Sequence, residues 1–527
     1  MIEVEVHQRL RAFLKEQGEP YWPHHLTMAR LVARALRMNR SALIQAGTPS
    51  GYFGRYRLSY LMPALMWPKP VVLVVPDSLR QRLLMVEIPR LQQWISTPKS
   101  IQMGDRWPGD HYQGIWLTSP QNWLAHRLRD DGSIPNDVLT VIDGADDLEA
   151  YAREQLTVAF RPIDWEHLML ACPNHREAIR DVRIRLTRSV FQHPVNPYEC
   201  HLIEQPEQDV LIQLDQHLSE VEPQHQGLDR DLAAQPGSND LGEITGRPCL
   251  TEAWNQFLAQ MQRSHQLIWT TVNRQQGQFS LHCSPIDVAP VLQPIWDNQP
   301  IVLIGGLLDL ETEATTFRQR LGLQDLTCLK FSPDRQNELI QLYLPERMPM
   351  PNTPQFQRAL MNELRVLLGA SATVQGLTVV LVGDTPLKRQ TAAQLAAEFG
   401  SRVQVEKTCL DENAILVTGW EFWQQHQAVL PAPRLLAIAT LPIPSLEHPL
   451  VAGRVAYYKR LRQNWFQLYL LPATLNELHR AIAPIRESKG VVALLDNRVN
   501  HRSYGQQILS ALSPHARINY VDAELFA

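Results

Sequence analysis

Short apolar runs alternate with helical patterns over much of this 527-residue chain. The runs have the length of buried strands and are rich in β-branched residues, which favours parallel sheets covered by helices. In the first third of the chain they lie at Ser41–Ala46, Val71–Pro76, Gly114–Thr118 and Val138–Ile142. Glu3–Gln17 and Leu26–Met38 instead carry apolar residues at helical spacing. The pattern predicts an α/β fold.

The pattern changes between Leu148 and Gly277, where long helical segments replace the short runs. Within this part, the polar stretch from Glu204 to Asp240 has little apolar periodicity. Apolar runs return at Gln278–Cys283, Ile301–Leu308, Thr378–Val382, Ala414–Thr418, Leu435–Leu441 and Gly490–Leu495. We predict a first α/β lobe at 1–147 and 278–310, a helical insert with an acidic mobile loop at 148–277, and a second lobe at 311–527.

Composition adds only broad limits. The chain has 44% hydrophobic residues and a formal net charge of -4, so any nucleic-acid surface must be a local patch. Its six cysteines lack metal-ligand spacing, which favours reduced thiols and no structural zinc. The N-terminal segment lacks the pattern of a secretory signal, and no apolar run reaches the roughly 18 residues of a membrane span. We expect a cytoplasmic protein with no membrane partner.

Several segments together carry a family pattern. In chain order they are AGTPSG with LSYLMPAL, VVLVVPDSLRQRLL, VLTVIDGADDLE, HCSPIDVAPVLQPIW, FRQRLGL, WEFW with LPIPSLEHPL, and LPATLNELHRAIAPIRESKGVVALLDNRV with YG. This order resembles the DinG branch of superfamily 2 DNA helicases, the group that includes XPD. The resemblance covers most of the chain. It implies two RecA-like lobes of the P-loop NTPase fold, a nucleotide cleft between them and a nucleic-acid path across them.

The first motif departs from the family pattern. A phosphate-binding loop needs small residues, a lysine for the β and γ phosphates, and a hydroxyl for magnesium. Gly47 and Gly51 keep the small residues, but Tyr52 stands at the lysine position and Phe53 at the hydroxyl position. Residues 54–57 are an insertion before the next helix. The loop is therefore expected to bind phosphates poorly.

The second motif keeps only part of its chemistry. Asp143 stands where the family holds magnesium, but Gly144 replaces the glutamate that orients the attacking water. A carboxylate at Asp146 or Asp147 would point in another direction, and a misplacement of about 1 Å can cost 100-fold in rate. We expect these two aspartates to form a solvated acidic turn at a strand end.

The motifs that couple the lobes have changed as well. Gly305–Leu307 replaces a Ser-Ala-Thr segment, and Gln424–Gln427 lacks the carboxylate of motif V. In motif VI, His479 and Ala483 replace a glutamine and an arginine, whereas Arg486 keeps an arginine-finger position. The resemblance therefore implies a pseudoenzyme with degenerate ATP binding and no catalytic residue. Its vestigial nucleotide-binding positions are Gly47, Gly51, Asp143 and Arg486.

No cofactor is predicted. Where the family has an iron–sulfur cluster, four cysteines between the first and second motifs hold it, and no cysteine lies between Gly51 and Asp143 here. His24 and His25 are adjacent, but they have no further ligand at suitable spacing, which is typical of capping or surface structure. ATP and magnesium remain possible only if the chain retains activity.

Two segments are candidates for nucleic-acid binding. Arg176, Arg180 and Arg183 fall at i, i+4 and i+7 of a helical pattern, so they can line a groove that follows a phosphate backbone. A solvated helix face with Glu177 and Asp181 as ion-pair partners explains the same pattern equally well.

The second candidate mixes basic and aromatic residues, as single-stranded nucleic acids require. Aromatic residues at helical spacing more often belong to a core, so base stacking is the less favoured interpretation. The basic members are Arg454, Lys459, Arg460 and Arg462, and the aromatic ones are Tyr457, Tyr458, Trp465 and Phe466.

Three functions remain open. The first is a helicase-like protein that binds single-stranded or forked nucleic acid, or a protein partner, after losing ATP hydrolysis and unwinding. The second is a weakly active ATP-dependent DNA helicase that uses Asp143, Arg486 and a rearranged loop at 51–57. The third is a protein-binding scaffold, which the acidic stretch at 204–240 suggests.

Overall fold

A computed structural model of the chain describes residues 1–18, 21–49, 54–96, 99–129, 132–219, 250–335, 337–372 and 375–520. The chain forms two compact units. The larger unit consists of Met1–Ala152, Val288–Pro444 and Trp465–Ala527, and the smaller unit of Arg153–Asp287 and Ser445–Asn464.

The first sheet of the larger unit has seven parallel strands in the order β11-β1-β10-β5-β2-β4-β3. The strands are β1 (Ala42–Gln45), β2 (Val71–Val74), β3 (Ile101–Met103), β4 (Ile115–Thr118), β5 (Thr140–Asp143), β10 (Ile301–Gly305) and β11 (Thr327–Lys330). The central strands are buried on both faces, which is why their sequences are apolar runs rather than alternating patterns.

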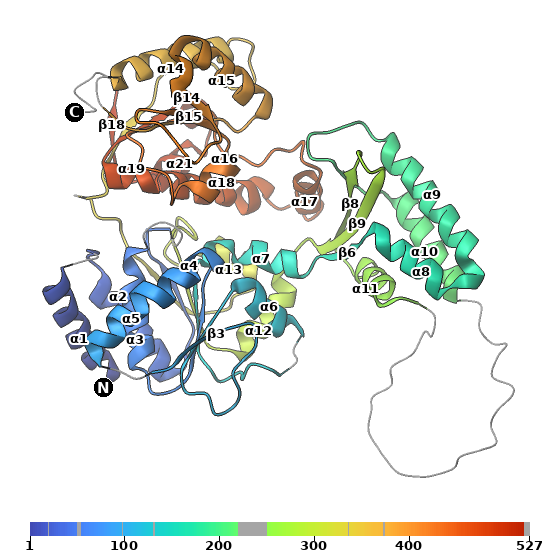
Figure 1. Ribbon diagram of the computed structural model, residues 1–527, viewed down its shortest axis with the longest axis horizontal. Helices are drawn as coiled ribbons and strands as arrows, with labels where there is room; N and C mark the ends of the chain where they lie inside the picture. Colours follow the sequence, from blue (N-terminus) through green and yellow to red (C-terminus); the bar gives the residue numbers. More distant parts are fainter. Residues whose placement is uncertain are drawn as a thin grey trace. The chain divides into compact units, whose positions relative to one another are not determined.

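Helices cover both faces of this sheet (Figure 1). One face packs against α1 (Ile2–Gln17), α2 (His25–Met38), α3 (Leu58–Met66) and α5 (Ile88–Ile95). On the other face lie α6 (Pro120–Arg129) and α12 (Ala289–Asn298), joined by the stacked rings of Trp123 and Trp296. Shorter elements of this lobe are η1 (Arg55–Arg57), α4 (Asp77–Arg82), η2 (Leu83–Glu87), η3 (Ala145–Asp147), α7 (Leu148–Gln155) and α13 (Thr315–Leu321).

The second sheet also has seven parallel strands, in the order β14-β15-β13-β16-β17-β12-β18. They are β12 (Ile340–Tyr343), β13 (Thr378–Leu381), β14 (Val403–Val405), β15 (Ile415–Thr418), β16 (Leu435–Ile438), β17 (Val491–Leu494) and β18 (His515–Ile518). α14 (Phe356–Ser371) and α15 (Thr385–Phe399) pack on one face. The other face carries α16 (Trp420–His426), α18 (Leu471–Ala481), α19 (Ala483–Ser488), α20 (Arg498–His501) and α21 (Gly505–Ala511).

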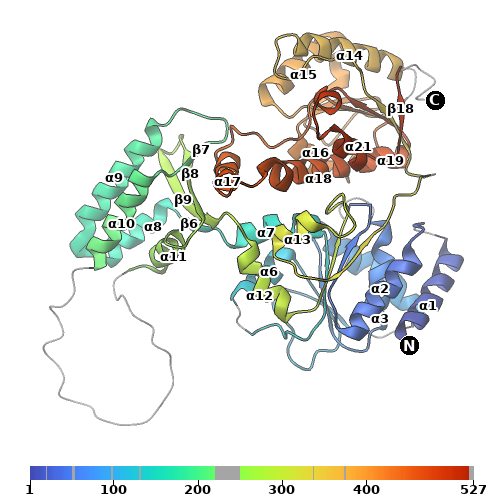
Figure 2. The same ribbon diagram turned by 180° about the vertical axis from the view of Figure 1, so that it is seen from behind.

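The smaller unit combines helices with an antiparallel sheet in the order β6-β9-β8-β7 (Figure 2). Its strands are β6 (Val158–Phe160), β7 (Cys200–Leu202), β8 (Gln266–Asn273) and β9 (Gln278–Pro285). Its helices are α8 (Pro162–Ala171), α9 (Arg176–Gln192), α10 (Gln205–Ser219), α11 (Glu252–Met261) and α17 (Pro449–Arg460). α17 lies so close to the sheet that a Cβ on Gly453 would approach Leu267 Cδ1 to 2.5 Å, so a larger residue would require this leucine to shift.

The predicted α/β class with two parallel sheets is confirmed, and each predicted apolar run contains a strand. The lobe boundaries differ from those expected. The run at 278–283 belongs to the smaller unit, because β9 pairs with β8 as a hairpin. The first lobe extends beyond residue 310, because β11 pairs with β1. None of the helices in the described part of the chain has the length and apolar character of a membrane span.

The polar stretch from Glu204 to Asp240 is only partly a loop. Its first part forms α10, which buries Val210, Leu211 and Leu214 against the smaller unit's core. The aperiodic appearance arises because this apolar stripe is narrow and surrounded by glutamines and acids. Residues 220–240, where we expected a mobile loop, lie outside the described residues.

Candidate nucleotide-binding site

The chain leaves β1 through Gly47, the first glycine of the expected phosphate loop. The N–H groups of Ala46 and Gly47 donate to the carbonyl oxygens of Gly305 and Gly306, at 2.8 and 3.0 Å. Gly47 has φ 74°, and a Cβ there would lie 3.2 Å from the Phe331 carbonyl oxygen, so glycine is required. Both N–H groups therefore already donate to protein carbonyl oxygens and are not available to a phosphate. Gly51, Tyr52 and Phe53 lie outside the described residues.

Asp143, at the end of β5, is fully buried and held by side chains. The hydroxyls of Tyr56 and Tyr60 donate to its two carboxylate oxygens, at 2.5 and 2.7 Å. Arg57 Nε lies 3.9 Å from the same carboxylate. Burial, together with the negative charge of Asp143, raises the pKa of Tyr60 well above its usual range, so this hydroxyl stays protonated. Both oxygens of the expected magnesium ligand therefore already have protein donors.

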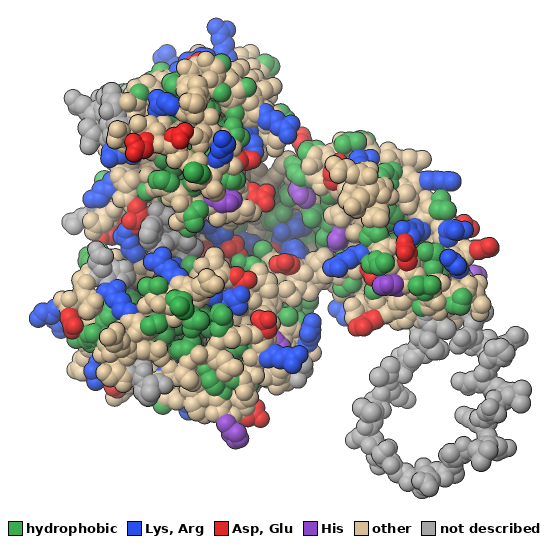
Figure 3. Space-filling model, viewed as in Figure 1, with side chains coloured by type: hydrophobic (Ala, Val, Ile, Leu, Met, Phe, Trp, Pro, Cys, Tyr) green, Lys and Arg blue, Asp and Glu red, His purple; other side chains and the backbone are tan. Residues whose placement is uncertain are grey.

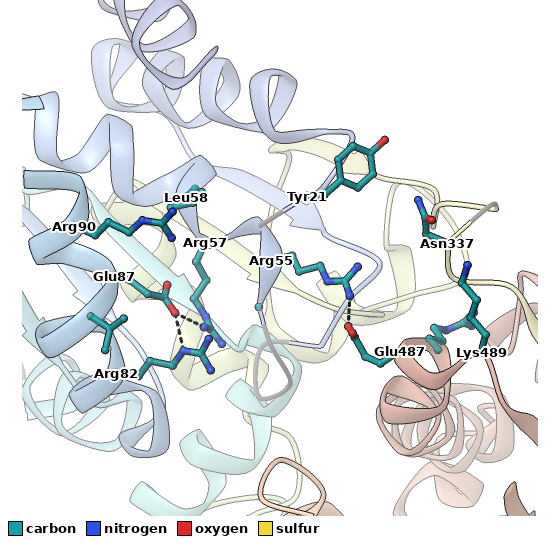
Figure 4. Close-up of a pocket in the computed structure, with 13 residues that line it drawn as sticks. Tyr21, Arg55, Arg57, Leu58, Arg82, Glu87, Arg90, Asn337, Glu487 and Lys489 are labelled. Atoms are coloured by element: carbon teal, nitrogen blue, oxygen red, sulfur yellow. Dashed lines mark hydrogen bonds and ion pairs between the residues drawn. The ribbon is translucent and has the colours of Figure 1, made fainter. Parts of the chain in front are cut away.

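Tyr56 belongs to the inserted residues before α3, whereas Tyr60 lies in the first turn of α3 itself. Arg57 is buried, and its Nη1 donates to Glu87 Oε1 at 2.7 Å, while Arg82 Nε donates to the same oxygen at 3.0 Å (Figure 4). Gly54 has φ 36°, and a Cβ there would lie 2.2 Å from Arg57 Cζ, so a larger residue would displace the guanidinium from this position. The insertion thus places a permanent cation beside the buried carboxylate.

The turn after Asp143 is stabilised internally. Gly144 has φ 86°, a left-handed conformation that costs a glutamate more than a glycine. The Asp146 carboxylate accepts hydrogen bonds from the N–H groups of Gly306 and Leu307. Burial raises the pKa of Asp146, although the nearby Arg480 opposes this shift.

The prediction of a solvated acidic turn is wrong for Asp146, whose carboxylate is occupied by backbone N–H groups. Asp147 accepts a hydrogen bond from Arg480 Nη2 at 2.7 Å, but its side chain remains 38% exposed. The turn is held in place because the backbone after β10 and the guanidinium of α18 both need acceptors at this point. Sequence reasoning did not identify either donor, since both come from distant parts of the chain.

Packing also explains the two glycines that replace the Ser-Ala-Thr segment. A Cβ on Gly305 would lie 2.8 Å from Asp146 Oδ2 and even closer to Leu308. A Cβ on Gly306 would lie 3.1 Å from both His479 Cε1 and Pro49. Serine or alanine at these positions would displace the side chains that hold the turn.

His479, on α18, contacts the phosphate-loop position. Its Nε2 lies 3.1 Å from the carbonyl oxygen of Gly47 and must donate, so the ring is neutral with its proton on Nε2. Burial, assisted by Arg486, Arg480 and Lys330, lowers the pKa of His479 to about 3. Its Nδ1 is buried and has no hydrogen-bond partner among the described residues.

Arg486 does not act as an exposed arginine finger in this structure. Its guanidinium is buried in α19 and donates to the carbonyl oxygens of Glu338, Leu512 and Ser513, at 2.6, 3.0 and 2.9 Å. Burial lowers the pKa of Arg486 to about 10. Arg486 therefore ties together the residues just before β12 and just before β18, whose carbonyl oxygens accept its hydrogen bonds.

Little space remains at the phosphate-loop position. The cavity beside Thr48, Pro49 and His479 has a volume of about 30 Å³. This is the space of about one water molecule, whereas small-molecule sites usually measure about 300–1,000 Å³. In the described part of the chain, no group of three His, Cys, Asp or Glu side chains could hold a metal ion.

The predicted arginine stripe lies on α9. Arg176 and Arg180 are exposed, and Arg183 is half-buried, 3.8 Å from Glu166 Oε1 of α8. The face seen in Figure 3 shows basic side chains dispersed among acidic, histidine and hydrophobic ones rather than gathered in one broad stripe. The stripe is therefore available to a ligand but modest in size.

The second basic segment begins within α17 and continues beyond its end into the larger unit at Trp465. Tyr457 is buried with its ring 5.3 Å from that of His265, and Phe466 packs against Tyr504 in the larger unit. Tyr457 is therefore a core residue, and Phe466 is half-buried against Tyr504. The exposed cations of the segment are Lys459, Arg460 and Arg462, while Arg454 is half-buried.

Other predicted positions have framework roles. His25 is buried with Nδ1 2.9 Å from Ser59 Oγ, and the ring of His24 stacks on Phe331. Trp423 packs inside the second lobe and donates to the Ala481 carbonyl oxygen. The histidine pair differs from the expected capping or surface role, because His25 is buried and His24 is the N-cap of α2 without a side-chain capping hydrogen bond.

The comparisons with known proteins agree with this architecture. A model of the "Helicase C-terminal domain" family matches residues 381–515. "ATP-dependent DNA helicase YoaA" of Haemophilus influenzae is 26% identical over 257 residues, which cover 46% of this chain and 40% of that protein. "3'-5' exonuclease DinG" of Bacillus subtilis is 24% identical over 287 residues, 49% of this chain and 31% of that protein. The chain is thus similar in sequence to YoaA and DinG over about half of its length.

Solved structures extend the likeness to the fold. The structure "XPD_APO" is 13% identical with a TM-score of 0.58, and the match covers 93% of this chain and 100% of that one. "Structure of S. tokodaii Xpd4" gives 13% identity, a TM-score of 0.57 and coverages of 94% and 100%. The two parallel sheets are thus RecA-like lobes. The matched curated relatives are longer, and this chain covers about two fifths of YoaA and less of DinG.

Sequence reasoning missed the residues that surround Asp143. Tyr56, within the inserted residues, and Tyr60, in α3, are one helical turn apart, and Arg57 lies between them in sequence. This spacing puts both hydroxyls on one side of the chain. The signal was present, but nothing local identified a strand end more than 80 residues away as their acceptor.

Proposed function

We propose that this chain is a helicase-like protein that binds single-stranded or forked nucleic acid without hydrolysing ATP. The observation that carries the proposal is the Asp143 carboxylate, whose two oxygens accept hydrogen bonds from Tyr56 and Tyr60. The relatives named as helicases support the nucleic-acid part of the proposal.

Magnesium would have to displace these tyrosines. The cation is usually bound through one or two carboxylates together with substrate phosphates. A hydrogen bond to a charged group contributes roughly 1.5–3 kcal/mol, so breaking both would weaken the metal site by about 100-fold or more. The Arg57 guanidinium beside the carboxylate adds electrostatic repulsion.

The attacking water would lack a base. Gly144 has no side chain, and its left-handed backbone disfavours a replacement. The nearest carboxylates, Asp146 and Asp147, are engaged by backbone N–H groups and by Arg480. General-base catalysis requires a free acceptor within hydrogen-bond distance of the water, and these residues do not supply one.

The decisive test combines nucleotide binding with turnover. Calorimetry with ATP and magnesium is expected to give no metal-dependent binding, and turnover with single-stranded DNA should stay far below about 1 s⁻¹, the lower end of ordinary enzymes. Turnover near that value that disappears in Asp143→Ala would instead establish the weakly active helicase.

Binding of single-stranded DNA tests the other half of the proposal. Fluorescence anisotropy should show affinity that falls steeply between about 50 and 200 mM salt, because counterions are released from the backbone. The triple variant R176Q/R180Q/R183Q should bind more weakly and with a shallower salt dependence. Arg263→Gln is the matched control, since Arg263 is another exposed arginine of the smaller unit. Absence of salt-dependent binding would favour the protein-binding scaffold.

A further inference from the structure

The loop that follows β10 is attached firmly to the first lobe. Gln45, which is fully buried at the end of β1, accepts from the N–H group of Asp309 at 3.0 Å and donates to the Glu311 carbonyl oxygen at 2.7 Å. Lys330, at the end of β11, donates through Nζ to the carbonyl oxygens of Asp309 and Leu310, at 3.0 and 2.6 Å. The backbone of this loop is therefore fixed to two neighbouring strands of the first sheet.

Two leucines of the same loop extend from the first lobe into the second. Leu307 and Leu310 are half-buried and pack against the hydrophobic core on the α18 side of the second sheet. Together with Leu471 and Leu475 of α18 they line a cavity of about 170 Å³. Leu307 occupies the last position of the family's Ser-Ala-Thr segment, so an aliphatic side chain stands where the resemblance implies a hydroxyl. Burial of these side chains joins the two lobes through protein atoms alone.

Polar contacts from α18 strengthen this connection. Arg480 Nη2 donates to Asp147 Oδ1 of the first lobe at 2.7 Å, and only 12% of the Arg480 side chain is exposed. The preceding residue, His479, lies with Nε2 3.1 Å from the Gly47 carbonyl oxygen. Opening the lobes would separate a mostly buried guanidinium from its carboxylate, which is unfavourable. Apolar and charged contacts thus hold the same two surfaces together.

We propose that residues 306–311, which we call the clasp, hold the two lobes together permanently, so that the lobes do not open and close. Closure that depends on a ligand requires an interface that is favourable only when the ligand is bound. Here both sides of the interface are side chains and backbone of the larger compact unit itself. The inference goes beyond the loss of ATP hydrolysis, because a protein without turnover can still change its shape.

The test measures the distance between spin labels on the two lobes of the full chain by pulsed electron paramagnetic resonance. One label is attached to Cys409, an exposed cysteine of the second lobe, and the other to Asp137→Cys, an exposed position of the first lobe. Cys249 and Cys328 are replaced by serine, and the other three cysteines are buried. A reference pair within the first lobe, Arg30→Cys with Asp137→Cys in a Cys409→Ser background, gives the width expected for a rigid body.

The distance distribution between the lobes should be as narrow as that of the reference pair. In L307S/L310S it should become about twice as wide, because released lobes sample several arrangements. V366S/V429S removes two exposed aliphatic side chains of the second lobe and is the matched control, which should change nothing. Arg480→Gln breaks the ion pair and leaves the clasp intact, and it should also widen the distribution. Circular dichroism of each variant verifies its fold.

Three results would overturn the proposal. The first is a distribution between the lobes that is much wider than the reference before any substitution in the clasp. The second is a distribution that narrows or shifts only when ATP or a nonhydrolysable analogue is added, and the third is one that L307S/L310S leaves unchanged. If L307S/L310S does not fold, Arg480→Gln takes its place in the third comparison. Failure here leaves the proposed function intact, because that function is judged by ATP turnover and by the DNA binding of the α9 variants.

Discussion

Two buried aspartates, at the ends of β5 and β17, have kept their places in different ways. Asp496 follows β17 and accepts hydrogen bonds from the N–H groups of Leu441 and Arg498, at 2.7 and 3.1 Å, besides pairing with the Arg498 side chain. Asp143 ends β5 and is held by the hydroxyls of two tyrosines. One carboxylate organises backbone of its own lobe, and the other is enclosed by side chains.

The comparison separates Asp496, which holds the backbone of its lobe, from Asp143, which stands at a reactive position of the family pattern. Backbone donors depend on the fold and not on side-chain identity, so the turn at Asp496 persists as long as the lobe does. Under the proposed function, Asp143 kept its identity for a new reason, since a buried carboxylate with two donors and a nearby cation is costly to remove. Stability measurements can separate these roles.

The largest effect is expected for Asp143→Ala. The substitution removes the acceptor of the buried Tyr60 hydroxyl and the negative charge beside Tyr56 and Arg57, which should lower the free energy of unfolding by about 3–5 kcal/mol. Urea denaturation measures the change, with the exposed Asp137→Ala as control. A neutral or stabilising outcome is typical of a strained catalytic residue, and it would contradict the comparison.

Acid should destabilise the chain through His479. Its folded-state pKa of about 3 lies below the unfolded value of about 6.5, so the unfolded chain binds more protons between these pH values. Stability is therefore complete above about pH 6.5 and falls by up to about 1.4 kcal/mol per pH unit toward pH 3. Unfolding curves of the protein and of His479→Gln, measured across this range, isolate the contribution. Parallel pH profiles would refute it.

Removing one tyrosine hydroxyl should have an intermediate effect. Tyr60→Phe deletes a buried hydrogen bond to a charged acceptor, which corresponds to about 1.5–3 kcal/mol. A double-mutant cycle with Asp143→Asn tests whether the loss comes from this contact. Additive effects of the two substitutions would mean that Tyr60 contributes through packing and not through Asp143.

The smallest effect is expected at Asp147. This residue pairs with Arg480, but its side chain is 38% exposed, and such ion pairs contribute about 0–1 kcal/mol. Asp147→Asn should therefore reduce stability by less than about 1 kcal/mol, and the loss should shrink in high salt. If the loss of stability equalled that of Asp143→Ala, the main electrostatic contribution would come from the Asp147–Arg480 pair and not from Asp143.

Local sequence pattern was sufficient for the central buried strands of both lobes, but it did not predict the edge strands β3, β11, β14 and β18, nor β12 beside one edge. The runs at Val71–Pro76 and Gly490–Leu495 are apolar because both faces of a parallel strand are covered, and that requirement is visible in a few consecutive residues. The order of the motifs was likewise enough to predict the family, which the comparisons support.

Pairings between distant segments were not visible in the same way. β8 and β9 form a hairpin that removes residues 278–285 from the first lobe, and β11 joins the first sheet beside β1. α10 was hidden because three buried aliphatic residues among polar ones give a weak helical pattern. Such boundaries depend on which partner a segment finds, and a partner is not encoded in the segment itself.

The sequence by itself determined the α/β class, the two-lobed order of motifs and the absence of the usual residues from the second motif and motif VI. Only the tertiary structure decided where the remaining charges lie: Asp143 against two tyrosines, Asp146 against the backbone after β10, and Arg486 inside a cage of carbonyl groups. The physical reason is that identity and spacing act along the chain, whereas the partner of a buried charge is chosen across it, by the need to satisfy every polar group that folding removes from water.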